Sequence, residues 1–197
     1  MSTHVSWQRR GAWVLALGGV QTLAYLALNH HAPAGSRTLP LTALDRATPF
    51  WPATVWAYFA LLACEVALPL CVRGWEEFRR LLAGYAIAMG VAFATYALYP
   101  THYPRPEPPE SANLSAWAYG TLVALDTPEC CLPSGHVIVP VLAAWSVARD
   151  RRSAWPLVVV ALLVPSVLTT KQHYALDVAA GLALAALAIV VARGVVP

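Results

Sequence analysis

The chain has 197 residues, of which 58% are hydrophobic and only 12% are charged, and its formal net charge is +3. A soluble domain typically contains about 45 to 50% apolar and about 25% charged residues, so this composition is typical of a membrane protein. The thirteen Lys and Arg residues form no run longer than two, which argues against a nucleic-acid-binding surface. We therefore predict one integral-membrane domain over residues 1–197, with no separate soluble domain.

Six apolar segments, each ended by charged residues or by prolines, follow one another along the chain. A membrane-spanning helix needs about 20 mostly apolar residues. The first segment could instead be a cleaved signal peptide, but its apolar run exceeds the roughly 7 to 15 residues usual there. We therefore predict an all-α fold, a bundle of six transmembrane helices. The predicted spans are 11–29, 52–72, 80–99, 135–148, 154–170 and 174–192.

The only long connection lies between the third and fourth spans. Its first part is rich in proline and cannot form a regular helix. Its second part, residues 114–125, contains Trp117 and Tyr119, which favour the level of the lipid headgroups. We expect a short interfacial helix there.

Loop charges predict the orientation of the bundle. With six spans, nine of the thirteen cations fall on the side that carries both termini. The positive-inside rule places that side in the cytoplasm and the long connection outside. The nine cations are Arg9, Arg10, Arg73, Arg79, Arg80, Arg149, Arg151, Arg152 and Arg193.

Three polar clusters interrupt the apolar sequence, and the span count brings all three to the outer side. They are residues 103–106 (Tyr-Pro-Arg-Pro), 133–136 (Pro-Ser-Gly-His) and 170–177 (Thr-Lys-Gln-His-Tyr-Ala-Leu-Asp). Because the intervening spans cross and return, segments about 70 residues apart can share one pocket. We predict such a pocket at the outer membrane interface.

The third cluster contains a histidine and a carboxylate at helical spacing. His173 and Asp177 are four residues apart, so on a helix Asp177 can accept the imidazole N–H. That contact leaves the other ring nitrogen free to act as a nucleophile or base. A helix-terminal hydrogen bond without a catalytic role is the alternative interpretation.

The other two clusters contain groups suited to an anion. Ser134 is a good N-cap, and Gly135 lets another group approach the free N–H groups of a helix start. Arg105, between two prolines, offers a guanidinium suited to phosphate oxygens. The alternatives are a simple capped helix and an arginine that contacts lipid headgroups.

Together these motifs resemble those of the type 2 phosphatidic acid phosphatase (PAP2) superfamily. The resemblance implies the six-helix core shared with vanadium haloperoxidase-like proteins, and phosphoryl transfer without a metal or other cofactor. It further implies that His173 attacks phosphorus to form a phosphohistidine, that Asp177 orients it, and that His136 protonates the leaving oxygen. Arg105, Ser134 and the Gly135 amide would bind the phosphate oxygens.

Two family positions differ in this sequence. The first motif's Lys is replaced by Leu98, and the third motif's Arg is replaced by Val167. We expect Lys171 to substitute for one of these cations, and His102 could add a donor. Similar departures occur in the branch that resembles inositol phosphorylceramide and sphingomyelin synthases, and a site poor in cations suits a singly charged phosphodiester.

Several other residues were considered for chemistry. Glu65 lies near the middle of the second span, where it should face the bundle, either as a structural group or as part of the site. The four cysteines form no Cys-x-x-Cys pair, so we expect buried or weakly reactive thiols. The outer histidines show no His-x3-His spacing and no carboxylate-rich cluster, so we expect no metal site. They are His30, His31, His102, His136 and His173.

The sequence thus predicts a membrane enzyme that acts on lipid phosphates. The leading hypothesis is a phosphatase at the outer leaflet, acting on phosphatidic acid, phosphatidylglycerol phosphate or a polyprenyl pyrophosphate. The alternative is a phosphotransferase that delivers the phospho-group to a lipid alcohol through the same His173 intermediate. A third hypothesis, motivated by Leu98 and Val167, is a transport or scaffolding protein without catalysis; retention of both histidines and Asp177 argues against it.

Overall fold

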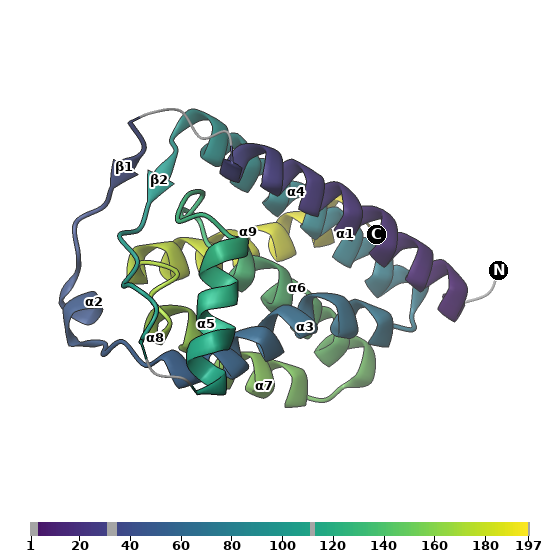
Figure 1. Ribbon diagram of the computed structural model, residues 1–197. Helices are drawn as coiled ribbons and strands as arrows, with labels where there is room; N and C mark the ends of the chain where they lie inside the picture. The colour runs from purple at the N-terminus through teal and green to yellow at the C-terminus, as the bar shows by residue number, and fades with distance from the viewer. Residues whose placement is uncertain (1–3, 31–34, 111–112, 197) are drawn as a thin grey trace.

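The computed structural model describes residues 4–30, 35–110 and 113–196. The fold is predominantly helical, with two short strands (Figure 1). The elements are α1 (Trp7–His30), β1 (Arg37–Thr38), α2 (Ala43–Ala47), the 3-10 helix η1 (Pro52–Thr54), α3 (Val55–Cys71), α4 (Trp75–Leu98), β2 (Thr101–His102), α5 (Leu114–Leu125), α6 (Gly135–Arg151), α7 (Trp155–Leu163), α8 (Ser166–Thr169) and α9 (Ala175–Val195).

Helix α6 forms the centre of the bundle. It packs against α3, α4, α7 and α9, and most of its length is buried. Small residues such as Ala143 and Ala144, both fully buried, let neighbouring helices approach closely. The outermost helix is α1, in which only Arg10 and Asn29 are buried. The helix that opens with the Pro-Ser-Gly-His cluster is therefore the best enclosed.

The predicted count of six spans is not confirmed. Within the described residues, four helical segments are long and apolar enough to cross a membrane: α1, η1 with α3, α4 and α9. These four make the chain an integral membrane protein by length and composition. At 17 residues, α6 is about 26 Å long, somewhat shorter than a hydrocarbon core of about 30 Å, and its last turn is charged.

The predicted fifth span is a broken helix. Residues 154–170 contain α7 and α8, and the break falls at Pro165, whose ring and missing N–H prevent continuation of the helix. Neither piece alone reaches the length of a span. The apolar composition predicts helix in this segment, and prolines within or near the spans predict kinks; at Pro165 the structure has a complete break instead of a kink.

Helix α4 begins at Trp75, five residues before the predicted boundary. Glu76 and Glu77 occupy its first turn, where acidic side chains stabilise a helix by interacting favourably with its dipole. Both carboxylates pair with Arg80 at 3.1 and 2.8 Å. Charges that would suggest a loop in a membrane chain therefore start a helix here.

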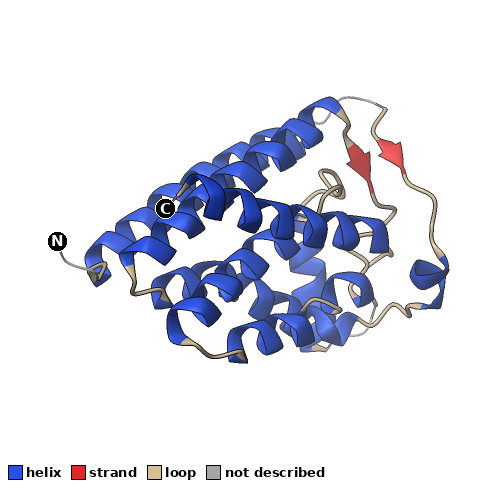
Figure 2. Cartoon of the chain, turned by 180° about the vertical axis from the view of Figure 1, so that it is seen from behind, coloured by secondary structure: helices blue, strands red, loops and turns tan. Residues whose placement is uncertain are grey.

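Both ends of the chain lie at the same end of the bundle (Figures 1 and 2). The Val5 N–H donates to the Arg73 carbonyl between α3 and α4, and the Gly74 N–H donates to Asp150 at the end of α6. The Arg80 side chain donates to the Val196 carbonyl. These contacts group the segments that the span count assigned to one side.

The opposite end carries β1, β2, α2 and α5. The two strands pair in parallel, and in Figure 1 helix α5 runs across the bundle helices. The Asn113 side chain caps α5 by accepting from the Ala116 N–H, and Leu114, Trp117 and Leu125 of α5 are exposed. The predicted short helix is confirmed with its predicted bounds.

Candidate active site

A cavity of about 160 Å³ lies between α1, α3, α4, the start of α6 and the turn before α9. His136 and His173 both line it, and their ring centroids are 5.7 Å apart. Gly135, Glu65 and Tyr25 contribute further parts of its wall. Residues that are far apart in the sequence, including two of the three predicted clusters, therefore meet in one place.

The protonation of the His173 ring follows from its partners. Its Nδ1 lies 3.1 Å from the Cys131 carbonyl oxygen and 3.3 Å from Asp177 Oδ2. A carbonyl oxygen can only accept, so Nδ1 carries the hydrogen and donates. In the neutral ring this tautomer leaves the lone pair on the other nitrogen, Nε2, which is the arrangement that a nucleophile requires.

Asp177 is fixed by the helix that it begins. It is fully buried at the third position of α9, and its Oδ2 also accepts from the Tyr174 N–H at 2.8 Å. The Asp177 carbonyl accepts from the Ser134 N–H at 3.1 Å, which joins α9 to the start of α6. A Cβ on Gly181 would lie 2.9 Å from the Ser134 carbonyl, so only glycine allows this approach. The two histidine-bearing segments are thereby held in one register.

The second histidine has its own carboxylate. His136 Nδ1 lies 3.2 Å from Glu65 Oε1 on α3, and edge contacts with Tyr58 and Tyr25 orient the ring. Of the two roles considered for Glu65, the geometry favours a contribution to the site. An intramembrane carboxylate is costly unless it has such a partner. The two imidazoles therefore each have a carboxylate behind Nδ1 and a ring edge toward the cavity.

Ser134 and Gly135 lie where the sequence places them, at the start of α6. Gly135 lines the cavity, and a Cβ there would touch the Tyr96 hydroxyl at 3.4 Å. Ser134 is fully buried, and its Oγ has no hydrogen-bond partner among the described residues. It does not act as the predicted side-chain cap of α6. The first N–H groups of a helix have no intrahelical acceptor and can hold an anion.

Arg105 does not line the cavity, and it is connected to the cavity wall through Asp126 and Tyr25. Its guanidinium donates to the Asp126 backbone carbonyl and, at 2.7 Å, to Asp126 Oδ2. Asp126 Oδ1 in turn accepts from Tyr25, which does line the cavity. Arg105 Nε is buried without a partner in the described part of the chain. Asp126 neutralises the charge that the motif was expected to present to phosphate.

Lys171 is not brought to the cavity. Its ammonium donates to the carbonyls of Asp45 at 3.1 Å and Thr48 at 2.6 Å. Asp45 also accepts from the Ala175 N–H at the start of α9. Burial alone would raise the pKa of Asp45, but hydrogen bonds from Thr42 and from the Ala175 N–H bring it below its ordinary value. Lys171 thus anchors α2 to the turn before α9.

Cys131, His173 and Asp177 form a group whose ligand atoms lie within 4.8 Å of one another. That spacing would allow a metal ion, although the sequence predicted none. Burial, reinforced by the Asp177 charge, raises the pKa of the Cys131 thiol, which disfavours the thiolate that a metal requires. Of the other histidines considered, His102 pairs with Glu129 at 3.2 Å, and His31 lies outside the described residues.

Three residues that position the groups of this site were not predicted from the sequence: Tyr25, Asp126 and Cys131. A usable signal existed for Asp126, because an acidic residue next to the apolar 114–125 segment needs a partner when it is buried. No local pattern marks Tyr25, since α1 reaches the cavity only through tertiary packing. Cys131 acts through its backbone carbonyl, which any residue possesses.

Comparison with protein families identifies a relationship for most of the chain. A model described as the PAP2 superfamily matches residues 43–191, which run from α2 to the last turns of α9 and leave α1 outside. No curated protein and no solved structure matches the chain. The match includes every residue that the sequence analysis assigned to catalysis or phosphate binding.

Proposed function

This chain belongs to the PAP2 superfamily, and on that basis we propose that it is a membrane phosphatase that hydrolyses a lipid phosphate through a phosphohistidine, at the outer face of the membrane. Membership supports a phosphatase or phosphotransferase type of activity connected with lipids. We also propose that residues 1–197 form a single domain.

The first step uses both histidines. The Nε2 lone pair of His173 attacks phosphorus, the bond from phosphorus to the lipid oxygen breaks, and His136 donates a proton to that oxygen. The Cys131 carbonyl and Asp177 stabilise the positive charge that develops on His173. Glu65 stabilises His136 in its protonated form before the transfer.

The second step reverses these roles. His136, now neutral, accepts a proton from a water molecule, whose oxygen attacks phosphorus and breaks the bond to His173 Nε2. Inorganic phosphate leaves, and both histidines return to their starting states. The N–H groups at the start of α6, with Gly135 leaving room for approach, would bind the phosphate oxygens in both steps. Ser134 and Arg105 would assist from behind the cavity wall.

One observation carries this proposal most strongly: His136 and His173 line one cavity, each backed by a carboxylate at Nδ1. An in-line displacement needs a nucleophile on one side of phosphorus and an acid on the other. The two rings differ in one partner, because Nδ1 of His173 also faces the Cys131 carbonyl, which fixes its tautomer, whereas Nδ1 of His136 faces Glu65. Candidate substrates are phosphatidic acid, phosphatidylglycerol phosphate and polyprenyl pyrophosphate.

A specific observation favours a second candidate, the transfer of a phospho-headgroup to a lipid alcohol. Arg105 is neutralised by Asp126, and Lys171 is bound to backbone carbonyls away from the cavity. A site with so little free positive charge suits a singly charged phosphodiester better than a phosphomonoester. This would place the chain near the inositol phosphorylceramide and sphingomyelin synthase-like branch.

Purified protein in detergent, supplied with each candidate lipid phosphate or with a phosphodiester lipid such as phosphatidylcholine or phosphatidylinositol, each with and without diacylglycerol or ceramide, distinguishes the two. Release of inorganic phosphate without an acceptor supports the phosphatase. A new headgroup-bearing lipid, formed only with the acceptor and without phosphate release, rejects it in favour of the transferase. The His173→Ala variant should abolish turnover in either case, and full activity in that variant would reject the mechanism.

A further inference from the structure

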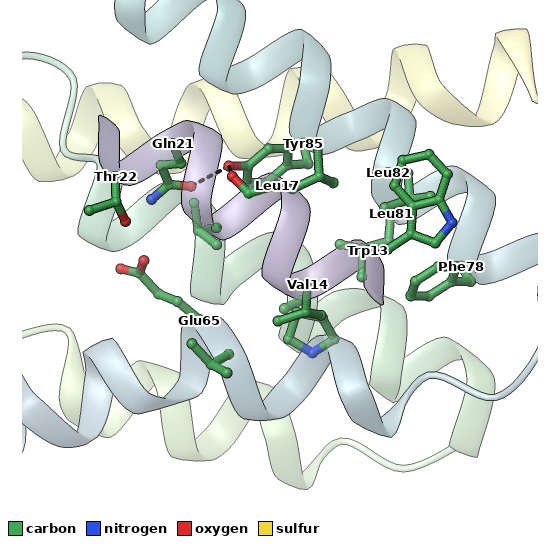
Figure 3. A pocket seen from close by; sticks show the side chains of 15 residues that line it. Trp13, Val14, Leu17, Gln21, Thr22, Glu65, Phe78, Leu81, Leu82 and Tyr85 are labelled. Carbon is green, nitrogen blue, oxygen red and sulfur yellow. Dashed lines mark hydrogen bonds between the residues drawn. The ribbon is translucent and has the colours of Figure 1, made fainter. Parts of the chain in front are cut away.

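A second cavity, of about 140 Å³, adjoins the first along α1. The two share Gln21, Thr22 and Glu65 as lining residues, so they lie next to each other in the fold. Beyond these polar residues the wall is apolar, with Trp13, Leu17 and Phe78 among its side chains (Figure 3). An apolar space within the bundle therefore lies directly beside the candidate active site.

The packing of α1 explains why space remains there. Near its start, Arg10 donates to the carbonyls of Leu70 and Val72, and near its end Asn29 donates to the Thr127 carbonyl. Between these two anchors no residue of α1 is buried. Its middle is joined to α4 by a hydrogen bond from Tyr85 to Gln21 (Figure 3). A helix that is held at both ends but loosely packed between them can leave a gap.

The direction of the cavity matches that of a lipid bound at the site. Along α1, Tyr25 lines the first cavity and Gln21 lines both cavities. The second cavity extends along α1 as far as Trp13. That distance is about 18 Å of helix, directed away from the histidines along the bundle axis. A lipid with its phosphate at His173 would extend its apolar part in this direction.

The size of the second cavity limits what it can hold. An engineered core cavity of about 150 Å³ binds benzene, so a space of 140 Å³ accepts roughly six carbon atoms. A segment of about that length from one hydrocarbon chain fits, and two chains side by side do not. Trp13 and Val66, partly exposed at its edge, leave a route to the surrounding lipid.

We propose that this apolar cavity binds one hydrocarbon chain of the lipid whose phosphate occupies the active site. The inference rests on the proposed function and adds a chain-binding subsite to it. Gln21 and Thr22 would contact the polar linkage between phosphate and chain as it passes them. Helix α1 lies outside residues 43–191. The part of the subsite wall that α1 supplies is therefore outside the region that matches the family.

Two neighbouring glycines of α1 provide a matched test. Gly18 lines the cavity and Gly19 does not, and a Cβ at either position meets nothing within 4 Å. Replacing either glycine within a helix should not hinder folding, since glycine is the poorer helix former. Gly18→Phe fills the subsite, whereas Gly19→Phe adds the same side chain on a neighbouring face of α1.

The first measurement compares kcat/KM for dipalmitoyl and dibutyryl phosphatidic acid. We expect Gly18→Phe to lower the ratio of long-chain to short-chain kcat/KM by about tenfold or more, because small changes in an apolar pocket have effects of that size. Gly19→Phe should leave the ratio within about twofold of the unmodified protein. An unchanged ratio in Gly18→Phe would overturn the proposal.

A second measurement does not depend on turnover. The His173→Ala variant is irradiated with phosphatidic acid that carries a diazirine in one acyl chain, and the labelled peptides are identified by mass spectrometry. Labelling of α1 or α4 that Gly18→Phe removes supports the subsite. Equal labelling by a phosphatidylcholine with the same chain means that the cavity takes any membrane lipid, which overturns it. If the unmodified protein releases phosphate from no lipid, the proposed function fails, and this labelling still decides the subsite.

Discussion

Asp177 and the Cys131 carbonyl share one hydrogen of His173, and this sharing determines what each contributes. In a hydrolase whose histidine is oriented by an aspartate alone, replacing that aspartate by asparagine also favours the wrong tautomer and costs about 10⁴ in kcat. Here the Cys131 carbonyl holds the hydrogen on Nδ1 independently of the carboxylate. Asp177→Asn should therefore remove mainly the stabilisation of positive charge on His173.

We expect Asp177→Asn to lower kcat by roughly 10²-fold and to change KM by less than about threefold. Asparagine retains an oxygen that can accept from the Tyr174 N–H, so the start of α9 should be preserved. Steady-state kinetics on phosphatidic acid checks this, with thermal unfolding in detergent as the control for folding. A loss near 10⁴ would mean that the carbonyl does not hold the tautomer.

The vicinal thiols before the Pro-Ser-Gly-His cluster give a second prediction at this scale. Burial raises the pKa of Cys130 to about 12, with smaller contributions from the charges of Glu129 and Asp126. At pH 8 the thiolate fraction is then about 10³-fold smaller than for an ordinary cysteine. Iodoacetamide should label Cys130 and Cys131 in the native protein far more slowly than after denaturation in SDS. Rapid native labelling at either position would contradict the burial described here.

Among single residues, type and spacing predicted that His136, His173 and Asp177 belong to one site, and the structure brings the three together. It could not predict which cations reach the cavity, because that depends on the partners that the fold supplies. Asp126 is about twenty residues from Arg105, and Asp45 lies far from Lys171 in the sequence. No local pattern connects such pairs.

At the scale of elements, the contact between α9 and the start of α6 sets the distance between the two histidine-bearing segments. Gly181 makes this contact possible, since a Cβ there would lie 2.9 Å from the Ser134 carbonyl and 3.2 Å from Val137 Cβ. Neither atom belongs to the flexible end of a side chain. A larger residue must therefore separate the two helices.

Gly181→Val should reduce the free energy of unfolding by about 1 to 3 kcal/mol, as overpacking of a core does, and should lower kcat with it. Gly194→Val is the matched control on the same helix, because a Cβ at Gly194 meets nothing within 4 Å. Thermal unfolding and phosphate release, measured on both variants, check the prediction. Equal stability and activity in the two variants would show that the close approach is unnecessary.

Element types were easier to predict than element continuity. Each of the six apolar segments contains helix, and the 114–125 helix was predicted to the residue, because apolar composition and interfacial aromatics are local signals. The early start of α4 at Trp75 was not predicted, and Pro165 ends a helix where the sequence predicts only a kink. Both features depend on whether neighbouring groups supply hydrogen bonds to free backbone groups or partners to charged side chains. The sequence of a single segment does not reveal those neighbours.

At the scale of the whole molecule, the chain separates its charges between two ends. Backbone and side-chain contacts group the N-terminal segment, the α3–α4 turn, the end of α6 and the C-terminal segment at one end. These segments carry nine of the thirteen cations. The histidines of the cavity lie toward the other end, near α2 and the strands. The positive-inside rule then predicts that both termini are cytoplasmic and that the cavity opens outside.

Reporter fusions test both this orientation and the number of crossings. We expect green fluorescent protein fused after Pro197 to fluoresce, and alkaline phosphatase fused after Glu110 to be active, because these positions lie on opposite sides in the predicted topology. A fusion after Ser153, between α6 and α7, decides whether the 17-residue α6 crosses the membrane. If α6 crosses, this position is cytoplasmic, like Pro197. Active alkaline phosphatase after Ser153 would mean that α6 and the broken α7–α8 pair do not cross and that the four long helices alone span the bilayer. Active alkaline phosphatase after Pro197 would reverse the orientation and place the histidine cavity on the cytoplasmic side.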